Sequence, residues 1–294
     1  MTVRIALIAF ITCLLFSDPG FGQIFVVDQD VGTIGEYSLA GDAINASLIT
    51  GLHQPEGVAI SGGNLFVANF GNGTIGKYTT AGAALDTSFI FGLNQPIGIA
   101  VSGNTLFVTN FSTGTVGAYD ATSGQAIAAS LISGLSNPFG IATSGGNLFV
   151  VNAGDGTVGE YGLNGETVNS SLISAVPGPR GIAISGANLF VTLNAGGAVS
   201  EYTMAGAPLT GSLVGGLSGP IGIAGFDGDL FVVNNNNGTV GEFTMAGETV
   251  NRTFISGLVG PTFIAVVPEP AAWLLLSLGA LTLLAMRKVR APHH

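Results

Sequence analysis

Few side chains in the central part of this chain could do chemistry. Residues 23–267 contain one histidine, His53, and one lysine, Lys77, and the only cysteine, Cys13, lies in the apolar segment at the N-terminus. A structural zinc site needs four Cys or His ligands, and covalent catalysis needs a nucleophile with a base and an orienting group. These residues supply neither set, so we predict no catalytic residues and no such metal site.

Oxygen ligands are more plentiful, and they recur at one position. A short apolar stretch ends in Asn or Asp five times, and Leu193 followed by Asn194 breaks the series at the remaining place. The five are Asp28, Asn69, Asn110, Asn152 and Asn234. Such side chains bind calcium, but after a strand they also cap the next turn through hydrogen bonds to the backbone. Because the residue recurs so regularly we favour capping and expect no cofactor, with calcium as the alternative.

Positions whose chemistry changes between repeats are better candidates for a ligand site. A proline recurs six times, and the residues that follow it are Glu56, Ile97, Phe139, Arg180, Ile221 and Thr262. Glu56 and Arg180 are three repeats apart, so they would face each other in a ring of six. Together with Phe139 they would form the kind of rim that orients a small polar ligand such as a sugar. We predict that these three residues bind the ligand; the alternative is that they are solvated loop residues.

The elements that carry these residues repeat about every 41 residues. The proline recurs at Pro55, Pro96, Pro138, Pro179, Pro220 and Pro261, and a Phe and a second aromatic residue keep the same spacing. Four short strands fit each repeat, with examples at residues 96–101, 65–68, 157–161 and 130–135. Glycines between them mark tight turns. Four strands in one such repeat are typical of a β-propeller blade.

The repeat is out of phase with the ends of the chain. Residues 23–28 read as a second strand, whereas residues 261–267 read as a first strand without the other three. Pairing these two segments completes a sixth blade and leaves no open sheet edge between the first and last repeats. The sequence therefore predicts an all-β, six-bladed propeller of four-stranded blades over residues 23–267, closed by its C-terminal strand.

The motifs Pro-x-Gly-Ile-Ala, Asn-Leu-Phe-Val-x-Asn and Gly-Thr-Val-Gly-Glu-Tyr resemble NHL-type repeats. They are also similar to the wider group of six-bladed propellers that includes virginiamycin B lyases and lactonases. The resemblance covers about residues 23–267 and implies the fold, which binding modules and enzymes share. A lyase of this group would need a pair of histidines and a glutamate, and only His53 is present. A lactonase would hold calcium in the central channel.

The two ends read as sorting segments. Residues 1–22 combine Arg4, an apolar run at 5–16 and small residues before position 23, the pattern of a signal peptide. Residues 268–294 contain an apolar run at 271–286, which as a helix would be about 24 Å long and could cross a membrane with snorkelling basic side chains. The flanking residues of this run are Pro268, Glu269 and Pro270 before it and Arg287, Lys288 and Arg290 after it.

This order of motif, apolar helix and basic end resembles the PEP-CTERM sorting signal of Gram-negative bacteria. The resemblance implies export across the inner membrane, anchoring through the C-terminal helix, and processing by an exosortase-type enzyme. The mature protein would then reside at the cell surface or outside the cell, often alongside exopolysaccharide. An ordinary tail anchor is the alternative.

The region between the two ends is acidic. Residues 23–270 contain three basic residues against sixteen acidic ones, and only 8% of the whole chain is charged. Such a surface repels phosphate backbones, so nucleic acid is not an expected partner. We predict a non-enzymatic surface or extracellular propeller that binds exopolysaccharide or a protein. A metal-dependent lactonase-like or lyase-like enzyme that uses the central channel is the alternative.

Overall fold

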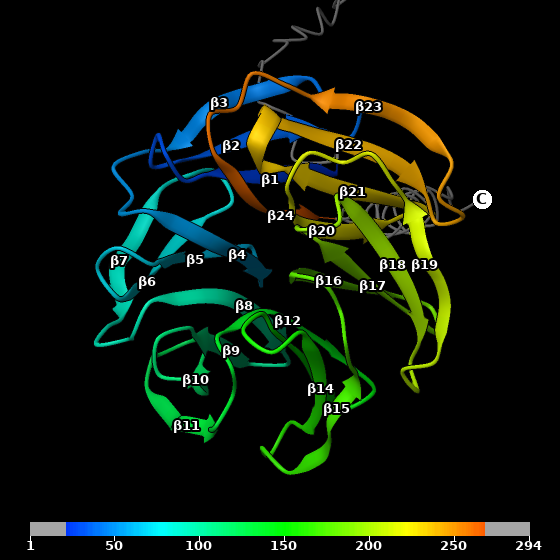
Figure 1. The fold of residues 1–294 in the computed structure, drawn as a ribbon. Helices are drawn as coiled ribbons and strands as arrows, with labels where there is room; N and C mark the ends of the chain where they lie inside the picture. Colours follow the sequence, from blue (N-terminus) through cyan, green and yellow to red (C-terminus); the bar gives the residue numbers. More distant parts are fainter. Residues whose placement is uncertain (1–21, 268–294) are drawn as a thin grey trace, which may run out of the picture. The chain divides into compact units, whose positions relative to one another are not determined.

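The computed structural model describes residues 22–267, which form six four-stranded antiparallel sheets around a common axis (Figure 1). The predicted six-bladed propeller is confirmed. Blade 1 is the sheet β24-β1-β2-β3, and blades 2 to 6 are formed in chain order by β4–β7, β8–β11, β12–β15, β16–β19 and β20–β23. The inner strands of successive blades contact one another, and β24 contacts β4, so the ring is closed.

Each blade runs from an inner strand at the axis to an outer strand at the rim. The inner strands are β24 (Pro261–Val267), β4 (Pro55–Ser61), β8 (Pro96–Ser102), β12 (Pro138–Ser144), β16 (Pro179–Ser185) and β20 (Pro220–Phe226). The second strands are β1 (Gln23–Asp28), β5 (Asn64–Asn69), β9 (Thr105–Asn110), β13 (Asn147–Asn152), β17 (Asn188–Leu193) and β21 (Asp229–Asn234). A short 3₁₀ helix, η1 (Asn235–Asn237), follows β21.

The remaining strands complete the outer half of each blade. The third strands are β2 (Thr33–Ser38), β6 (Thr74–Thr79), β10 (Thr115–Asp120), β14 (Thr157–Gly162), β18 (Ala198–Thr203) and β22 (Thr239–Thr244). The outer strands are β3 (Ala43–Ile49), β7 (Ala84–Ile90), β11 (Ala126–Ile132), β15 (Thr167–Ile173), β19 (Pro208–Val214) and β23 (Thr249–Ile255).

The predicted bounds hold for three strands of the blade and are wrong for the fourth. A strand was expected at residues 130–135, but β11 spans Ala126–Ile132. Most of an outer strand is exposed and only its last residue is buried, so no apolar alternation marks where it begins. The chain leaves the sheet at Gly134, whose φ of 77° lies in the left-handed region that favours glycine.

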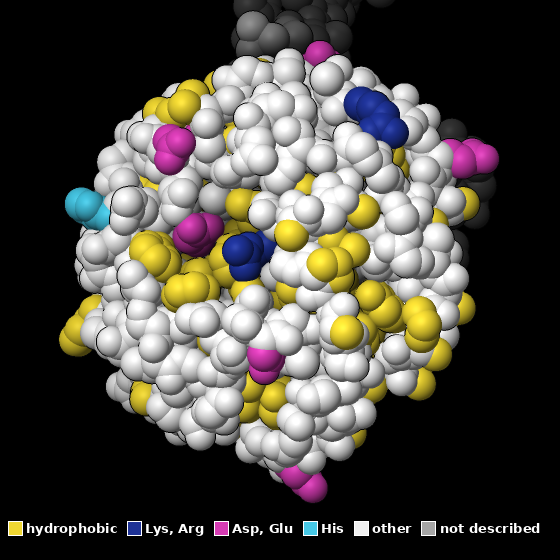
Figure 2. Space-filling view, in the orientation of Figure 1, with side chains coloured by type: hydrophobic (Ala, Val, Ile, Leu, Met, Phe, Trp, Pro, Cys, Tyr) yellow, Lys and Arg dark blue, Asp and Glu magenta, His cyan; other side chains and the backbone are white. Residues whose placement is uncertain are grey.

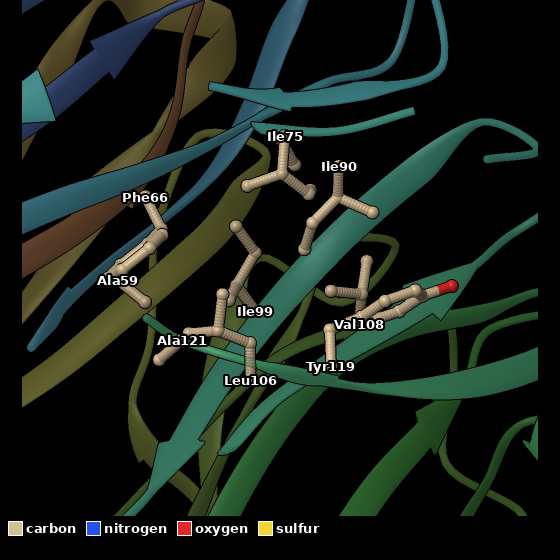
Figure 3. Close-up of a cluster of buried hydrophobic side chains, with 10 residues drawn as sticks. Ala59, Phe66, Ile75, Ile90, Ile99, Leu106, Val108, Tyr119 and Ala121 are labelled. Atoms are coloured by element: carbon tan, nitrogen blue, oxygen red, sulfur yellow. The ribbon is translucent and has the colours of Figure 1, made fainter. Parts of the chain in front are cut away.

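The hydrophobic core is divided among the interfaces between blades. Each pair of neighbouring blades encloses one cluster of buried apolar side chains. Figure 3 shows the cluster between blades 2 and 3, where Phe66 and Ile75 face Leu106 and Val108. Because both faces of the second strands are covered, these strands read as continuous apolar runs.

The glycine of the Thr-Val-Gly-Glu-Tyr motif makes room for an aromatic ring. A Cβ atom on Gly76 would lie 2.7 Å from the ring of Tyr78, which folds back over the strand. The same relation holds between Gly35 and Tyr37. In five of the six blades a glycine stands two residues before the recurring aromatic residue, and blade 5 has Ser200 in its place.

The ring closes through strand pairing and a carboxylate. In blade 1, β1 pairs with β24, with Ile24 opposite Val266, as predicted. The two carboxylate oxygens of Asp28 each accept a hydrogen bond of 2.9 Å, from the backbone N–H groups of Val259 and Gly260. The first and last repeats are therefore joined without a disulfide.

Several predictions concern residues that the structure does not describe. The predicted signal peptide covers residues 1–22, of which the structure describes only residue 22. The predicted linker that begins at residue 268 and the predicted helix at residues 271–286 also lie outside the described residues. Within residues 22–267, no helix has the length and hydropathy that crossing a bilayer requires.

We expect β24 to be essential for the stability of the ring. A chain that ends at residue 260 should lose cooperative unfolding, because the edge of β1 and the apolar side chains beside it become exposed to water. A chain that ends at residue 267 is the matched control and should unfold cooperatively. Calorimetry and circular dichroism measure both, and equal melting temperatures would show that β24 does not close the ring.

Candidate functional site

Five of the six inner strands approach the next inner strand so closely that a side chain is excluded at their third position. A Cβ atom added there would clash with a backbone carbonyl oxygen of the next inner strand. Five of the six inner strands carry glycine at this position, namely Gly57, Gly98, Gly140, Gly181 and Gly222. The channel between the strands is therefore narrow, and the side chains at its mouth are crowded.

Phe263 of β24 occupies the sixth of these positions. Its ring stacks on that of Phe139, with 5.8 Å between the centroids and 21° between the planes. Blades 1 and 4, which carry these residues, lie opposite each other in the ring. Phe111 packs edge-on against Phe139 at 6.5 Å. Aromatic rings from opposite sides thus meet across the channel.

The guanidinium group of Arg180 lies over the ring of Phe139. Its Cζ atom is 4.9 Å from the centroid of Phe139, the geometry of a cation–π interaction. Arg180 is only half-buried, whereas Phe139 is buried. Desolvation lowers the pKa of Arg180, and the nearby carboxylate of Glu56 opposes this effect. The ring of Phe139 thus supports a cation at the mouth, with part of its surface open to solvent.

Glu56 is the buried acid of the same mouth. Its side chain is only 8% exposed, and its Oε1 atom accepts a 2.5 Å hydrogen bond from Nε2 of Gln29. Its Oε2 atom is buried without a hydrogen-bond partner. Burial raises the pKa of Glu56 to about 7, although the Gln29 hydrogen bond and the charge of Arg180 lower it. The neutral form of this carboxyl group is therefore much more favoured here than in water.

Figure 2 shows the surface of this mouth. An acidic and a basic side chain lie next to each other near the centre of the ring, and hydrophobic side chains surround them. Glu56 and Arg180 are not hydrogen-bonded to each other: Oε1 of Glu56 accepts from Gln29, and its Oε2 has no partner. A ligand with both a donor and an acceptor could contact both charges.

The structure brings the three predicted residues together. Glu56, Phe139 and Arg180 are each the second residue of an inner strand, and they lie around one mouth. Glu56 and Phe139 are more buried than the sequence suggested for a rim. Ligand binding by these residues stays a prediction.

Sequence reasoning missed Gln29 and Phe263. Phe263 could have been found, because it stands where the five other repeats have glycine. Gln29 follows Asp28, at a position that varies from repeat to repeat, so it carried the same kind of signal. Both residues break the repeat, as Glu56 and Arg180 do.

Three of the four recurring Asn residues accept a hydrogen bond from the backbone before the inner strand of their own blade. Oδ1 of the fourth, Asn152, is buried without a partner, and its Nδ2 donates to Thr157. Oδ1 of Asn69 accepts a hydrogen bond from the backbone N–H of His53 at 3.2 Å, and its Nδ2 donates to Thr74 at 3.3 Å. Asn110 and Asn234 accept equivalent bonds from Asn94 and Ser218. Their side chains therefore connect the turn after the second strand to the loop before the inner strand, a capping role. Among residues 22–267, no group of three or more His, Cys, Asp or Glu side chains could hold a metal ion.

A second hollow lies beside the mouth, between blades 1 and 2. Its volume is about 400 Å³, and its lining includes Gln29, Asp30, His53, Gln54 and Gly71. Gln29 thus lines this hollow and also donates a hydrogen bond to Glu56 at the mouth. The hollow is largely polar and shares Gln29 with the mouth.

Two family models match parts of the chain. Residues 52–78 match the NHL repeat, and residues 266–290 match the PEP-CTERM protein-sorting motif. Both resemblances inferred from the sequence are confirmed. No curated protein matches the chain in sequence.

Several solved structures share the fold at low sequence identity. A chain of the nidogen/laminin complex has a TM-score of 0.69 at 16% identity, with 84% of this chain and 99% of that chain covered. Virginiamycin B lyase from Staphylococcus aureus has a TM-score of 0.55 at 18% identity, with 74% and 70% covered. The computationally designed Ika8 protein has a TM-score of 0.52 at 17% identity, with 82% and 74% covered. At these identities the likeness establishes the fold alone.

The burial of Glu56 makes a prediction about pH and stability. The pKa of Glu56 is about 7 in the folded protein and near 4.5 in the unfolded chain. Between these two pH values the folded protein therefore keeps a proton on Glu56 that the unfolded chain has released. Its stability should therefore fall as pH rises from about 5 to about 8, by about 3 kcal/mol from this group. Glu56→Gln should remove this loss.

Urea unfolding of the wild type and the variant at both pH values measures the effect. Glu160→Gln is the control, because Glu160 is hydrogen-bonded to Asn147 and is not at the mouth. A stability difference between wild type and Glu56→Gln that does not change with pH would contradict the assignment.

Proposed function

We propose that this protein is an exported, non-enzymatic propeller that binds an acidic exopolysaccharide at the mouth formed by Glu56, Phe139 and Arg180. One observation carries the proposal. A guanidinium group held on an aromatic ring lies close to a buried carboxyl group that has one oxygen without a partner. This arrangement offers a cation, an apolar face and a hydrogen-bonding group to one small ligand.

A sugar acid has the chemistry that complements this mouth. Its carboxylate would bind Arg180, since guanidinium and carboxylate form strong charge-assisted hydrogen bonds. Its hydroxyl groups would reach Oε2 of Glu56, which needs a partner. The apolar face of the sugar ring would pack on Phe139. Arg180 also lies in a strongly acidic protein, so it is a local site where an anion is attracted rather than repelled.

The sorting motif supplies the cellular context. The PEP-CTERM match at residues 266–290 implies an exported, membrane-anchored protein that is processed by an exosortase-type enzyme. We propose that the processed propeller resides at the surface of a Gram-negative cell, where exopolysaccharide is available to it.

An enzyme that uses the same mouth is the second candidate. It is favoured by the pKa of Glu56, which at about 7 is suited to a general base. Asp28 offers no second free carboxylate, because both its oxygens accept backbone hydrogen bonds. If Glu56 acted as a base on a uronate polymer, unsaturated products would accumulate with the wild type and not with Glu56→Gln. We expect no such products from either protein.

Arg180→Ala should weaken binding of an acidic oligosaccharide. The expected loss is about 1–3 kcal/mol, or roughly 5- to 150-fold in Kd, the contribution of a charged hydrogen bond. Titration calorimetry of the full-length protein in detergent against oligogalacturonate measures it, with the neutral galactose oligomer as a non-binding ligand.

Arg252→Ala is the matched control for Arg180→Ala. It removes the same charge from β23 at the rim, where Arg252 bonds the carbonyl of Gly215 and lies over Phe243. Equal losses for the two variants would show that net charge, and not the mouth, determines the affinity.

Replacing Pro268, Glu269 and Pro270 together by alanine should prevent processing of the tail. Intact mass spectrometry of protein from a host with an exosortase-type enzyme should find the variant with its basic end attached. The wild type should have lost the segment that contains Arg287, Lys288 and Arg290. Wild-type surface protein that keeps this segment would favour an ordinary anchor.

A further inference from the structure

The mouth is arranged so that an anionic ligand on Arg180 would lie close to the buried carboxyl group of Glu56. Phe139 and Phe263 meet across the channel, so the ligand has to stop at the mouth above them. A carboxylate bound to Arg180 would therefore lie within the range over which Arg180 already influences Glu56. Two ionised carboxyl groups in such a site repel each other strongly unless one of them is protonated.

Resting on the proposed function, we infer that the mouth binds an acidic sugar together with one proton, which is held between Oε2 of Glu56 and an oxygen of the ligand. Oε2 is the only oxygen of Glu56 that is free for this role, because Oε1 accepts from Gln29. When protonated, Glu56 becomes a hydrogen-bond donor to the ligand. Arg180 then balances the ligand's charge alone.

No other titratable group beside Glu56 is placed to take this proton. The strands packed against β4 are β1, β5, β8 and β24, and among them only β1 carries a titratable group, Asp28. Asp28 is occupied by the N–H groups of Val259 and Gly260. From the opposite blade Arg180 faces Glu56, and Gln29 is neutral. Asp30 and His53 line the neighbouring hollow and are exposed.

The direction of the pH effect is determined by this charge balance. In the free protein the pKa of Glu56 is about 7, and an anion beside it raises this pKa further. Binding therefore takes up a proton wherever the free protein has lost one, which is above about pH 7. Affinity should be constant below about pH 6 and should fall nearly tenfold per pH unit above about pH 7.5.

Titration calorimetry in two buffers of different ionisation enthalpy tests the inference directly. The probe is oligogalacturonate, and the protein is the full-length chain in detergent. The number of protons taken up by the wild type should be close to one near pH 8 and close to zero near pH 6. Glu56→Gln, which mimics the protonated acid, should bind without proton uptake and with the same affinity at both pH values.

A second buried acid serves as the control. Glu36 lies on β2, outside the mouth, and accepts a 2.6 Å hydrogen bond from Gln23; burial raises the pKa of Glu36 as well. Glu36→Gln should keep the proton uptake of the wild type. Binding without proton uptake by the wild type near pH 8, or loss of uptake in Glu36→Gln, would overturn the inference while leaving the proposed binding intact. No binding at either pH would overturn both.

Discussion

The close approach of the inner strands is the constraint on which the rest of the propeller depends. Their backbones come so near that only a residue without a Cβ atom fits at the third position of five strands. This approach determines how narrow the channel is and how tightly neighbouring blades enclose their apolar clusters. It also makes a charged or aromatic side chain at the second position crowd against its neighbours instead of extending into water.

Ionisable groups at the mouth of such a ring lose part of their hydration. Burial disfavours the charged form of Glu56 and of Arg180, but the two groups differ in the contacts that offset this loss of hydration. Arg180 rests on the face of Phe139 and keeps part of its surface in solvent, so its charge is supported. Glu56 has one neutral donor and one unbonded oxygen. The structure therefore tolerates the acid at a cost in stability, and ionisable groups held at such a cost are typical of functional sites.

Much of this architecture is predictable from the sequence because the blade is a repeated unit. The period, the phase of the two ends and the pairing of β1 with β24 can be read from the spacing of Pro, Phe and Tyr residues. Symmetry also places Glu56 opposite Arg180. The burial of Glu56 and its hydrogen bond to Gln29 could not be predicted, since they depend on the width of the channel and on a loop of another blade. The outer strands were misplaced because they are exposed, so burial imposes no pattern on them.

Residues that recur from blade to blade and residues that differ between blades have different roles in this molecule. Asn69, Asn110 and Asn234 tie the second strand of their blade to the loop before the inner strand, and Asp28 does the same in blade 1. Blade 5 has Leu193 at this position, and Leu193 belongs to the same buried apolar cluster as Val176 in the loop before the inner strand. Mouth positions differ from blade to blade, because their side chains make different contacts: Thr262 donates a hydrogen bond to the backbone of Glu56, whereas Arg180 lies over Phe139. The chemistry of the mouth therefore follows from the residues that occupy these positions around a fixed frame of six blades.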